Sequence, residues 1–207
     1  MMKIFRTTVW IALLCLGGQA MAADGIRQLQ RFVDTTRTAE GTFEQTVISD
    51  GGTPAIQSGT FAFARPGKFR WIYQIPYEQW LVGDGDRLWI WDIDLNQVTV
   101  KRIGDALGAT PAAVLFGTGE LDDDFTLTDE GSRAGLDWVR AVPKRPDTSF
   151  ESLRLGLANG ELKRIEMRDN FGQQSFIVFT RLSPNPVLDE ALFRFDVPVR
   201  ADVIGDE

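Results

Sequence analysis

Histidine is absent from the 207-residue chain, and cysteine occurs only once, at Cys15. These two absences exclude histidine-based catalytic triads, thiol nucleophiles and the common zinc sites. The chain also lacks a G-x-S-x-G turn and a Walker phosphate-binding loop. We therefore expect a protein that is not an enzyme and uses no cofactor and no metal ion. A carboxylate-based enzyme is the open alternative, but the sequence places no pair of carboxylates for it.

The N-terminus has the three parts of a secretory signal peptide. Lys3 and Arg6 form a short positive region, and an apolar run follows from Val9 to Leu16. The sequence A-M-A at 20–22 fits the A-x-A pattern of a cleavage site. Since the run is too short for a permanent membrane span, residues 1–22 are predicted to be removed on export. An uncleaved anchor at the membrane surface is the alternative.

Removal of this segment would change both the cysteine content and the charge. Cys15 would leave with it, so no disulfide bond could stabilise the mature fold. The net charge is −7 for the whole chain and would become about −9. An acidic surface excludes nucleic acid as a partner. It suits a basic partner protein, and it equally suits a protein that only needs to stay in solution.

After Gly41 the sequence consists of short strand-forming segments separated by turns. Asp50-Gly51-Gly52, Arg65-Pro66-Gly67, Gly83-Asp84-Gly85-Asp86 and Asn159-Gly160 have hairpin chemistry. This spacing predicts an antiparallel meander of about a dozen strands in one curled sheet or barrel. The expected strands are 42–48, 58–65, 69–75, 79–82, 87–93, 97–103, 125–129, 136–142, 150–157, 161–168, 175–181 and 193–197.

Short helices are predicted beside the sheet. Ile26, Leu29 and Val33 recur at helical spacing and give one apolar face to a helix over about 24–38. One further helical turn is expected at 189–192.

The segment 109–116 is predicted to form another short helix, which is almost wholly apolar. Thr110 can cap it, Pro111 suits its first helical position, and Gly117 can end it.

Several predicted strands are apolar on both faces. Leu88 and Ile90 alternate with Trp89 and Trp91, so the two pairs point to opposite sides. The segment 69–73 places three aromatic side chains on one face. A sheet with one face in water alternates with polar residues, so something covers the second face in places. The pattern leaves two arrangements equally open: a curled sheet around a cavity, and a filled core without one.

The segment Arg65-Pro66-Gly67-Lys68-Phe69-Arg70-Trp71 resembles the R-P-x-x-F-x-W strand of the LolA family, the periplasmic carriers of outer-membrane lipoproteins. Other segments agree with that family in order and spacing: Gly41 to Gln45 with the first strand, Leu81 to Trp91 with the central hairpin, Asp94 to Val98 with the next turn and strand, Thr110-Pro111 with the lid helix, and Phe193 to Pro198 with the C-terminal strand. The resemblance identifies residues 23–207 as a LolA-like lipoprotein carrier domain.

This resemblance implies a mainly β fold with short helices, an unclosed antiparallel β-barrel of about 11–12 strands capped by an α-helical lid. It implies a periplasmic chaperone that carries lipoproteins from the inner to the outer membrane, with their acyl chains in a hydrophobic cavity. The inner-membrane ABC transporter LolCDE would supply the cargo, and the outer-membrane receptor LolB would accept it. We expect such a carrier to act as a monomer.

The resemblance also implies roles for individual residues. Arg65 would donate hydrogen bonds to carbonyl groups of the lid and hold the empty form closed, whereas without the family it would be an ordinary arginine at a strand end. The acyl-chain cavity would be lined by Phe43, Phe69, Trp71, Trp89 and Trp91. Phe69 and Trp71 match family positions, yet either alone could equally be a plain core aromatic. The lid would be formed by Ile26, Leu29, Val33, Thr110, Pro111, Val114, Leu115 and Phe116.

Two further functions are compatible with the same fold. One is a carrier of another lipid, such as a glycolipid, and the other is a scaffold that senses a protein. Lipid co-purified from the periplasm would identify the first, and a scaffold would release no lipoprotein from spheroplasts.

Overall fold

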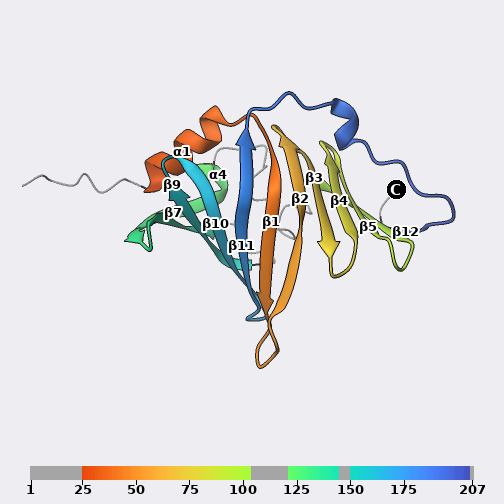
Figure 1. The fold of residues 1–207 in the computed structure, drawn as a ribbon, viewed down its shortest axis with the longest axis horizontal. Helices are drawn as coiled ribbons and strands as arrows, with labels where there is room; N and C mark the ends of the chain where they lie inside the picture. The colour runs from red at the N-terminus through yellow and green to blue at the C-terminus, as the bar shows by residue number, and fades with distance from the viewer. Residues whose placement is uncertain (1–24, 104–120, 145–149, 206–207) are drawn as a thin grey trace, which may run out of the picture.

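The computed structural model describes residues 25–103, 121–144 and 150–205 (Figure 1). The predicted signal peptide at 1–22 and the predicted helix at 109–116 lie outside these ranges, and so do Thr110, Pro111, Val114, Leu115 and Phe116. Among the described residues, none of the helices has the length and hydropathy of a transmembrane span.

Twelve strands form a single sheet. The strands are β1 (Thr38–Ile48), β2 (Ala55–Ala64), β3 (Lys68–Ile75), β4 (Gln79–Asp84), β5 (Arg87–Asp92), β6 (Gln97–Arg102), β7 (Phe125–Arg133), β8 (Leu136–Pro143), β9 (Phe150–Ala158), β10 (Glu161–Asp169), β11 (Gln174–Pro184) and β12 (Asp202–Gly205). They follow the order β12-β6-β5-β4-β3-β2-β1-β11-β10-β9-β8-β7. Because β12 and β7 are the two outer strands of this order, the sheet is unclosed, as the family resemblance implies.

The sheet consists of two meanders joined through β1 and β11. Within each meander every strand pairs with its neighbour in sequence, which follows from the short turns between them. The pairing of β1 with β11 is antiparallel and extends from Ala39 opposite Pro184 to Ile48 opposite Gln174. Figure 1 shows these two strands side by side in the middle of the sheet.

The C-terminal part of the chain differs from the prediction. The expected strand at 193–197 is wrong, since the short 3₁₀ helix η1 (Glu190–Phe193) ends at its first residue and residues 194–197 form no strand. The predicted helical turn at 189–192 is therefore confirmed within one residue, and Asp189 caps it by accepting a hydrogen bond from Ala191 N at 2.9 Å. The last strand, β12, was not predicted and pairs with β6 in parallel, in a sheet that is otherwise antiparallel.

Two helices complete the described chain. The four-residue helix α4 (Leu121–Asp124) directly precedes β7. The longer helix α1 (Gly25–Thr35) packs against strands β7 to β10. It ends earlier than predicted because the backbone N–H groups of Arg37 and Thr38 bond to the Asn185 side chain instead of continuing the helix.

The main hydrophobic core lies on one face of the sheet, which we call the inner face; the opposite face is the outer face. Leu88 of β5 and Leu155 of β9 belong to the same core cluster. In a flat sheet these strands would be about 34 Å apart, at about 4.8 Å per strand. One cluster can include both only because the sheet curls around its inner face, and Figure 1 shows the strands turning away at both sides.

The curl depends on local irregularities in the central strands. Gly59 stands at a β-bulge in the pairing of β2 with β3, and a Cβ atom there would lie 1.8 Å from the Ile72 carbonyl oxygen. A bulge bends its strand and increases the local twist. Only glycine allows the two backbones to approach this closely.

Candidate functional site

An aromatic cluster covers the middle of the inner face. Phe43 of β1 and Trp71 of β3 are each 1% exposed, and their ring centroids are 4.0 Å apart. Phe61 stacks on Trp71 at 5.6 Å, and Phe179 of β11 meets both at their edges. The cluster brings together Phe43 and Trp71, two of the residues that the resemblance assigns to the acyl-chain cavity. It also contains Phe61 and Phe179, which the sequence analysis did not single out.

Two more phenylalanines extend this cluster toward the β2–β3 turn. Phe63 and Phe69 are directly opposite each other across the two strands, and each is 2% exposed. The Arg65 guanidinium lies over the Phe63 ring, 5.4 Å from its centroid. The turn thus places a cation at the end of an otherwise apolar wall.

Arg65 is half-buried, and much of its charged group is removed from water. Burial and, to a smaller extent, the positive charge of Arg37 lower its pKa to about 10, while the charge of Asp34 opposes the shift. The Nε and Nη2 atoms are buried and have no hydrogen-bond partner within the described residues. A guanidinium has five N–H donors, so Arg65 has unused donors beside the inner face.

Helix α1 covers the half of the inner face formed by β7 to β10. Leu29 and Phe32 are buried there, at 1% and 3% exposed, while Ile26 and Val33 pack partly buried against the same core. Its apolar stripe therefore faces the sheet, as the helical spacing predicts. Gly25 begins the helix so close to the sheet that a Cβ atom there would lie 2.9 Å from Val139 Cγ2.

A small polar cluster interrupts the apolar inner face, and we call it the polar node: Gln45, Trp71, Tyr73 and Ser175. The Tyr73 hydroxyl donates to Gln45 Oε1 at 2.9 Å, and Gln45 Nε2 donates to Ser175 Oγ at 3.4 Å. Gln45 is 5% and Ser175 is 2% exposed. The sequence analysis missed this node, although Gln45 follows Phe43 by two positions and must therefore share its face.

The expectation that Trp89 and Trp91 line the same cavity as Phe69 and Trp71 is wrong. Strand register places Phe69 in line with Gly83 and Leu88, and Trp71 in line with Leu81 and Ile90. Because side chains alternate along β5, its two tryptophans point to the outer face. There Trp89 stacks on Phe195 at 5.5 Å, and Trp91 meets the same ring at 6.2 Å. The alternation itself was predicted correctly; the assignment of that face to the cavity was not.

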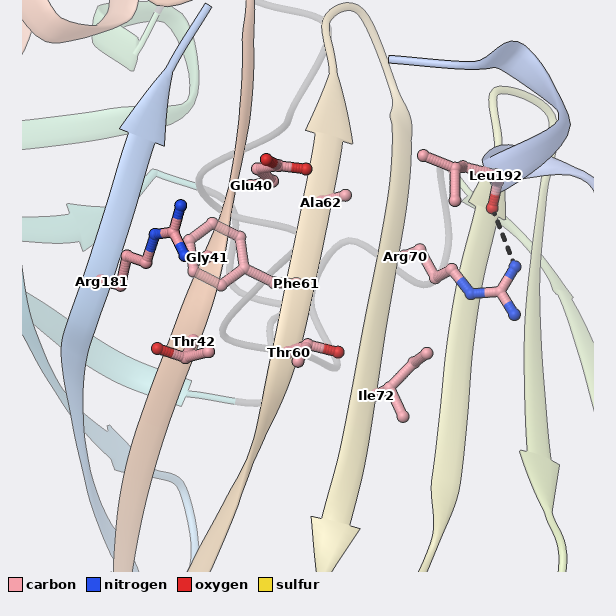
Figure 2. A pocket seen from close by; sticks show the side chains of 10 residues that line it. All are labelled: Glu40, Gly41, Thr42, Thr60, Phe61, Ala62, Arg70, Ile72, Arg181 and Leu192. Atoms are coloured by element: carbon pink, nitrogen blue, oxygen red, sulfur yellow. Dashed lines mark hydrogen bonds between the residues drawn. The ribbon is translucent and has the colours of Figure 1, made fainter. Parts of the chain in front are cut away.

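The C-terminal segment also packs on the outer face beside a pocket of about 310 Å³ (Figure 2). Arg70 donates from Nη1 to the Leu192 carbonyl oxygen at 3.1 Å and lies over the Trp80 ring at 4.3 Å. Figure 2 shows Glu40, Thr42, Thr60, Ile72 and Arg181 around the remaining space, and Gly41, Phe61 and Ala62 complete its lining. No role was predicted from the sequence for Lys68 or Arg70. The Lys68 ammonium group lies 3.7 Å from the Glu190 carboxylate of η1.

Within the described ranges no group of three or more acidic side chains is arranged to hold a metal ion. The geometry defines a class of proteins built on an open, curled β-sheet, here with an aromatic inner face, a helix over one half of that face and a half-buried arginine at its end.

Comparisons with known proteins agree with this architecture. The sequence profile described as "Outer membrane lipoprotein carrier protein LolA" matches residues 34–196. The chain belongs to the LolA family, which confirms the resemblance drawn from its sequence.

Relatives of similar length are also named as lipoprotein carriers. An outer-membrane lipoprotein carrier protein of Dechloromonas aromatica is 45% identical over 205 residues, covering 99% of this chain and 97% of the relative. One from Methylococcus capsulatus is 40% identical over 208 residues and covers both chains fully. A solved LolA-superfamily protein from Nitrosomonas europaea has a TM-score of 0.53 at 10% identity, covering 84% of this chain and 99% of that one. This last similarity concerns the fold alone.

Proposed function

We propose that this protein is a periplasmic chaperone that carries lipoproteins from the inner to the outer membrane. In this role it binds the acyl chains of its cargo against the inner face and catalyses no reaction. The observation that carries the proposal is the aromatic inner face of an unclosed sheet, around Phe43, Phe61 and Trp71. The relatives named as lipoprotein carriers support it.

The physical need for a carrier follows from the cargo. Exposing an acyl chain to water costs about 0.8 kcal/mol per CH₂ group. A chain of about sixteen carbons would therefore cost on the order of 12 kcal/mol, so a free lipoprotein would not cross an aqueous gap at a useful rate. An apolar face that opens and closes removes this cost while leaving the cargo releasable.

In the proposed pathway the cargo comes from the inner-membrane transporter LolCDE and passes to the outer-membrane receptor LolB. ATP hydrolysis belongs to the transporter, which is consistent with a chain that has no phosphate-binding loop. The carrier would act as a monomer and be exported with its signal peptide removed. Its acidic surface suits basic docking surfaces on either partner.

A release assay tests this function. Spheroplasts that accumulate lipoprotein on the inner membrane are incubated with the purified mature chain, and lipoprotein in the supernatant is measured. We expect release that depends on LolCDE and ATP, followed by transfer to membranes that contain LolB. If the protein releases no lipoprotein, or co-purifies with a glycolipid identified by mass spectrometry, the proposed cargo is wrong.

Arg65 is proposed to be the latch of the lid. Its buried Nε and Nη2 would donate to carbonyl groups of lid segments that close over the inner face, and α1 with Ile26, Leu29 and Val33 would be one of those segments. Release would then be favoured because the empty carrier gains these hydrogen bonds, each with a charged donor and worth about 1.5–3 kcal/mol.

Substitution of this arginine gives the first prediction. Arg65→Leu should accept cargo but pass it to the receptor at least about tenfold more slowly, because closing no longer gains about 1.4 kcal/mol or more. The measurement is the rate of transfer from the loaded carrier to LolB. Arg70→Leu is the matched control, since Arg70 lies on the outer face, and it should transfer at the wild-type rate. Equal transfer by Arg65→Leu and the wild type would exclude the latch.

A further inference from the structure

The polar node is an unusual feature for a wall that only has to bind hydrocarbon. It joins three strands, β1, β3 and β11, through the hydrogen bonds Tyr73–Gln45 and Gln45–Ser175. An acyl chain offers neither donors nor acceptors, and burying polar groups among aromatic rings costs free energy unless they are satisfied. The node therefore gives the aromatic face one polar position, beside which a polar part of the ligand can lie.

Trp71 is the member of the node with an unmet hydrogen-bonding group. Its side chain is 1% exposed, and its indole Nε1 is buried with no hydrogen-bond partner among the residues that the structure describes. Burial raises the pKa of the neighbouring Tyr73 to about 12, and the approach of the Trp71 side chain opposes this rise. This approach does not reach hydrogen-bond geometry, so the indole N–H lies beside the Tyr73 hydroxyl without being satisfied by it.

The chemistry of this group limits what it can bind. An indole N–H is only a donor, so its partner must be an acceptor. A buried donor left without a partner costs about 1–3 kcal/mol. In lipids, ester or amide bonds join the acyl chains to the head of the molecule. The carbonyl oxygen of these bonds is an uncharged acceptor, which enters an apolar site more easily than a charged group does.

We propose that the Trp71 indole N–H, supported by Gln45 and Ser175, receives the ester or amide carbonyl at the head of an acyl chain. The proposal rests on the proposed function and adds to it a specificity: the protein recognises the linkage of the chain as well as its hydrocarbon. Phe43, Phe61 and Phe179 surround the indole ring and would contact the methylene groups beyond the carbonyl.

The test compares two lipopeptides that differ only at the linkage. One has two palmitoyl chains joined as esters to an S-glyceryl cysteine peptide, and the other has two hexadecyl chains joined as ethers. Affinities come from displacement of a fluorescent fatty-acid probe. We expect the wild type to prefer the ester by about 3–10-fold, the value of one net hydrogen bond.

Trp71→Phe keeps an aromatic ring but removes the donor, and its preference should fall to about one. Any loss of packing affects the ester and the ether equally, so the ratio reports the hydrogen bond alone. Trp91→Phe is the matched control, because Trp91 Nε1 is likewise buried without a partner in the described part of the chain but lies on the outer face. The control should keep the wild-type preference.

A second measurement does not depend on any affinity. With ¹³C in the ester carbonyl, its infrared stretch in the bound wild type should lie below the frequency in an alkane, and Trp71→Phe should reverse this shift. An unshifted carbonyl, or equal ester and ether affinities in the wild type, overturns the proposal while leaving the carrier function standing. Failure of the wild type to bind either lipopeptide would instead overturn the proposed function.

Discussion

At the scale of single residues, Asp84 shows how a turn stabilises the sheet through one carboxylate. The carboxylate accepts hydrogen bonds from the backbone N–H groups of Asp86 and Arg87 at 2.9 and 2.8 Å and from Trp89 Nε1 at 2.9 Å. Burial raises the pKa of Asp84, but these three hydrogen bonds and the charge of Arg87 outweigh it and leave the pKa below its ordinary value.

Asp84→Asn should therefore destabilise the protein in a pH-dependent way. A carboxylate whose folded pKa is lowered contributes stability above its unfolded pKa, about 3.9, and loses that contribution as the pH falls toward the folded value. We expect a loss of about 1–2 kcal/mol in the free energy of unfolding at pH 7, because the amide weakens charge-assisted bonds. The difference should shrink below about pH 4. Urea titrations at several pH values measure it.

The control for this experiment is Asp86→Asn. Asp86 lies in the same turn, and its side chain is exposed. Its substitution should change the free energy of unfolding by less than about 0.5 kcal/mol. A constant Asp84→Asn difference from pH 7 to pH 3 would contradict the assigned role.

At the scale of elements, helix α1 is held at both ends by the sheet and its connections. At the N-terminal end the Gly25 backbone N–H donates to Asp129 Oδ2 at 2.9 Å, and Gln28 Oε1 accepts from Gly160 N at 2.8 Å. At the C-terminal end Asn185 accepts from Arg37 N at 2.8 Å and donates to the Thr35 carbonyl at 2.9 Å. Residues far apart in sequence thus determine where the helix lies.

Asn185 is the residue whose replacement tests this anchoring. It adopts a left-handed conformation, with φ of 56°. Asn185→Ala should lose the side-chain bonds and add backbone strain, for a total of about 2 kcal/mol in the free energy of unfolding. Asn185→Gly loses only the bonds and should be less destabilising. Hydrogen exchange of the α1 amides should become faster in both variants, and equal stability of the two would contradict the strain.

Anchoring of α1 also bears on the proposed lid. A helix fixed at both ends covers β7 to β10 as part of the core, so it can act as a lid only when one of these anchors opens. If Asn185→Ala also speeds loading of a lipopeptide, the C-terminal anchor limits opening.

At the scale of the whole molecule, the curled sheet carries apolar side chains on two faces that serve different purposes. The inner face holds the aromatic cluster proposed for cargo. The outer face of β4 to β6 is covered by the C-terminal segment, whose Phe193 is 3% exposed and whose Phe195 packs on Trp89 and Trp91. We therefore expect substitutions on the outer face to change stability without changing cargo binding, and substitutions on the inner face to change cargo binding.

Phe195→Ala tests this separation. It should lower the free energy of unfolding by about 2–3 kcal/mol and shift tryptophan emission to longer wavelength, because Trp89 and Trp91 become exposed to water. Its affinity for the ester lipopeptide should equal that of the wild type at a temperature where both are folded. Phe43→Ala, on the inner face, should instead lose at least about tenfold in affinity, since a buried phenylalanine contributes more than about 1.4 kcal/mol. Similar affinities of the two variants would show that the faces are coupled.

The sequence by itself determined the β architecture, most strand positions and the side of each strand on which a residue lies. Alternation along a strand and the chemistry of Asn-Gly or Asp-Gly turns are local properties, so Phe69 and Trp71 were correctly placed on one face of their strand, and Trp89 and Trp91 on the face opposite to Leu88 and Ile90. Alternation within a strand did not show that the two pairs lie on different faces of the sheet. The resemblance to a family then identified Arg65 as a residue of interest.

Only the tertiary structure decided which face encloses the core and what covers the other one. Covering depends on contacts between distant segments, such as Phe195 on Trp89, β12 on β6 and Asn185 at the end of α1. The curl of the sheet likewise brings Gln45, Tyr73 and Ser175 together on the inner face. A period of two residues assigns side chains to one of two faces, but it carries no information on which face closes, because closure is a property of the whole sheet.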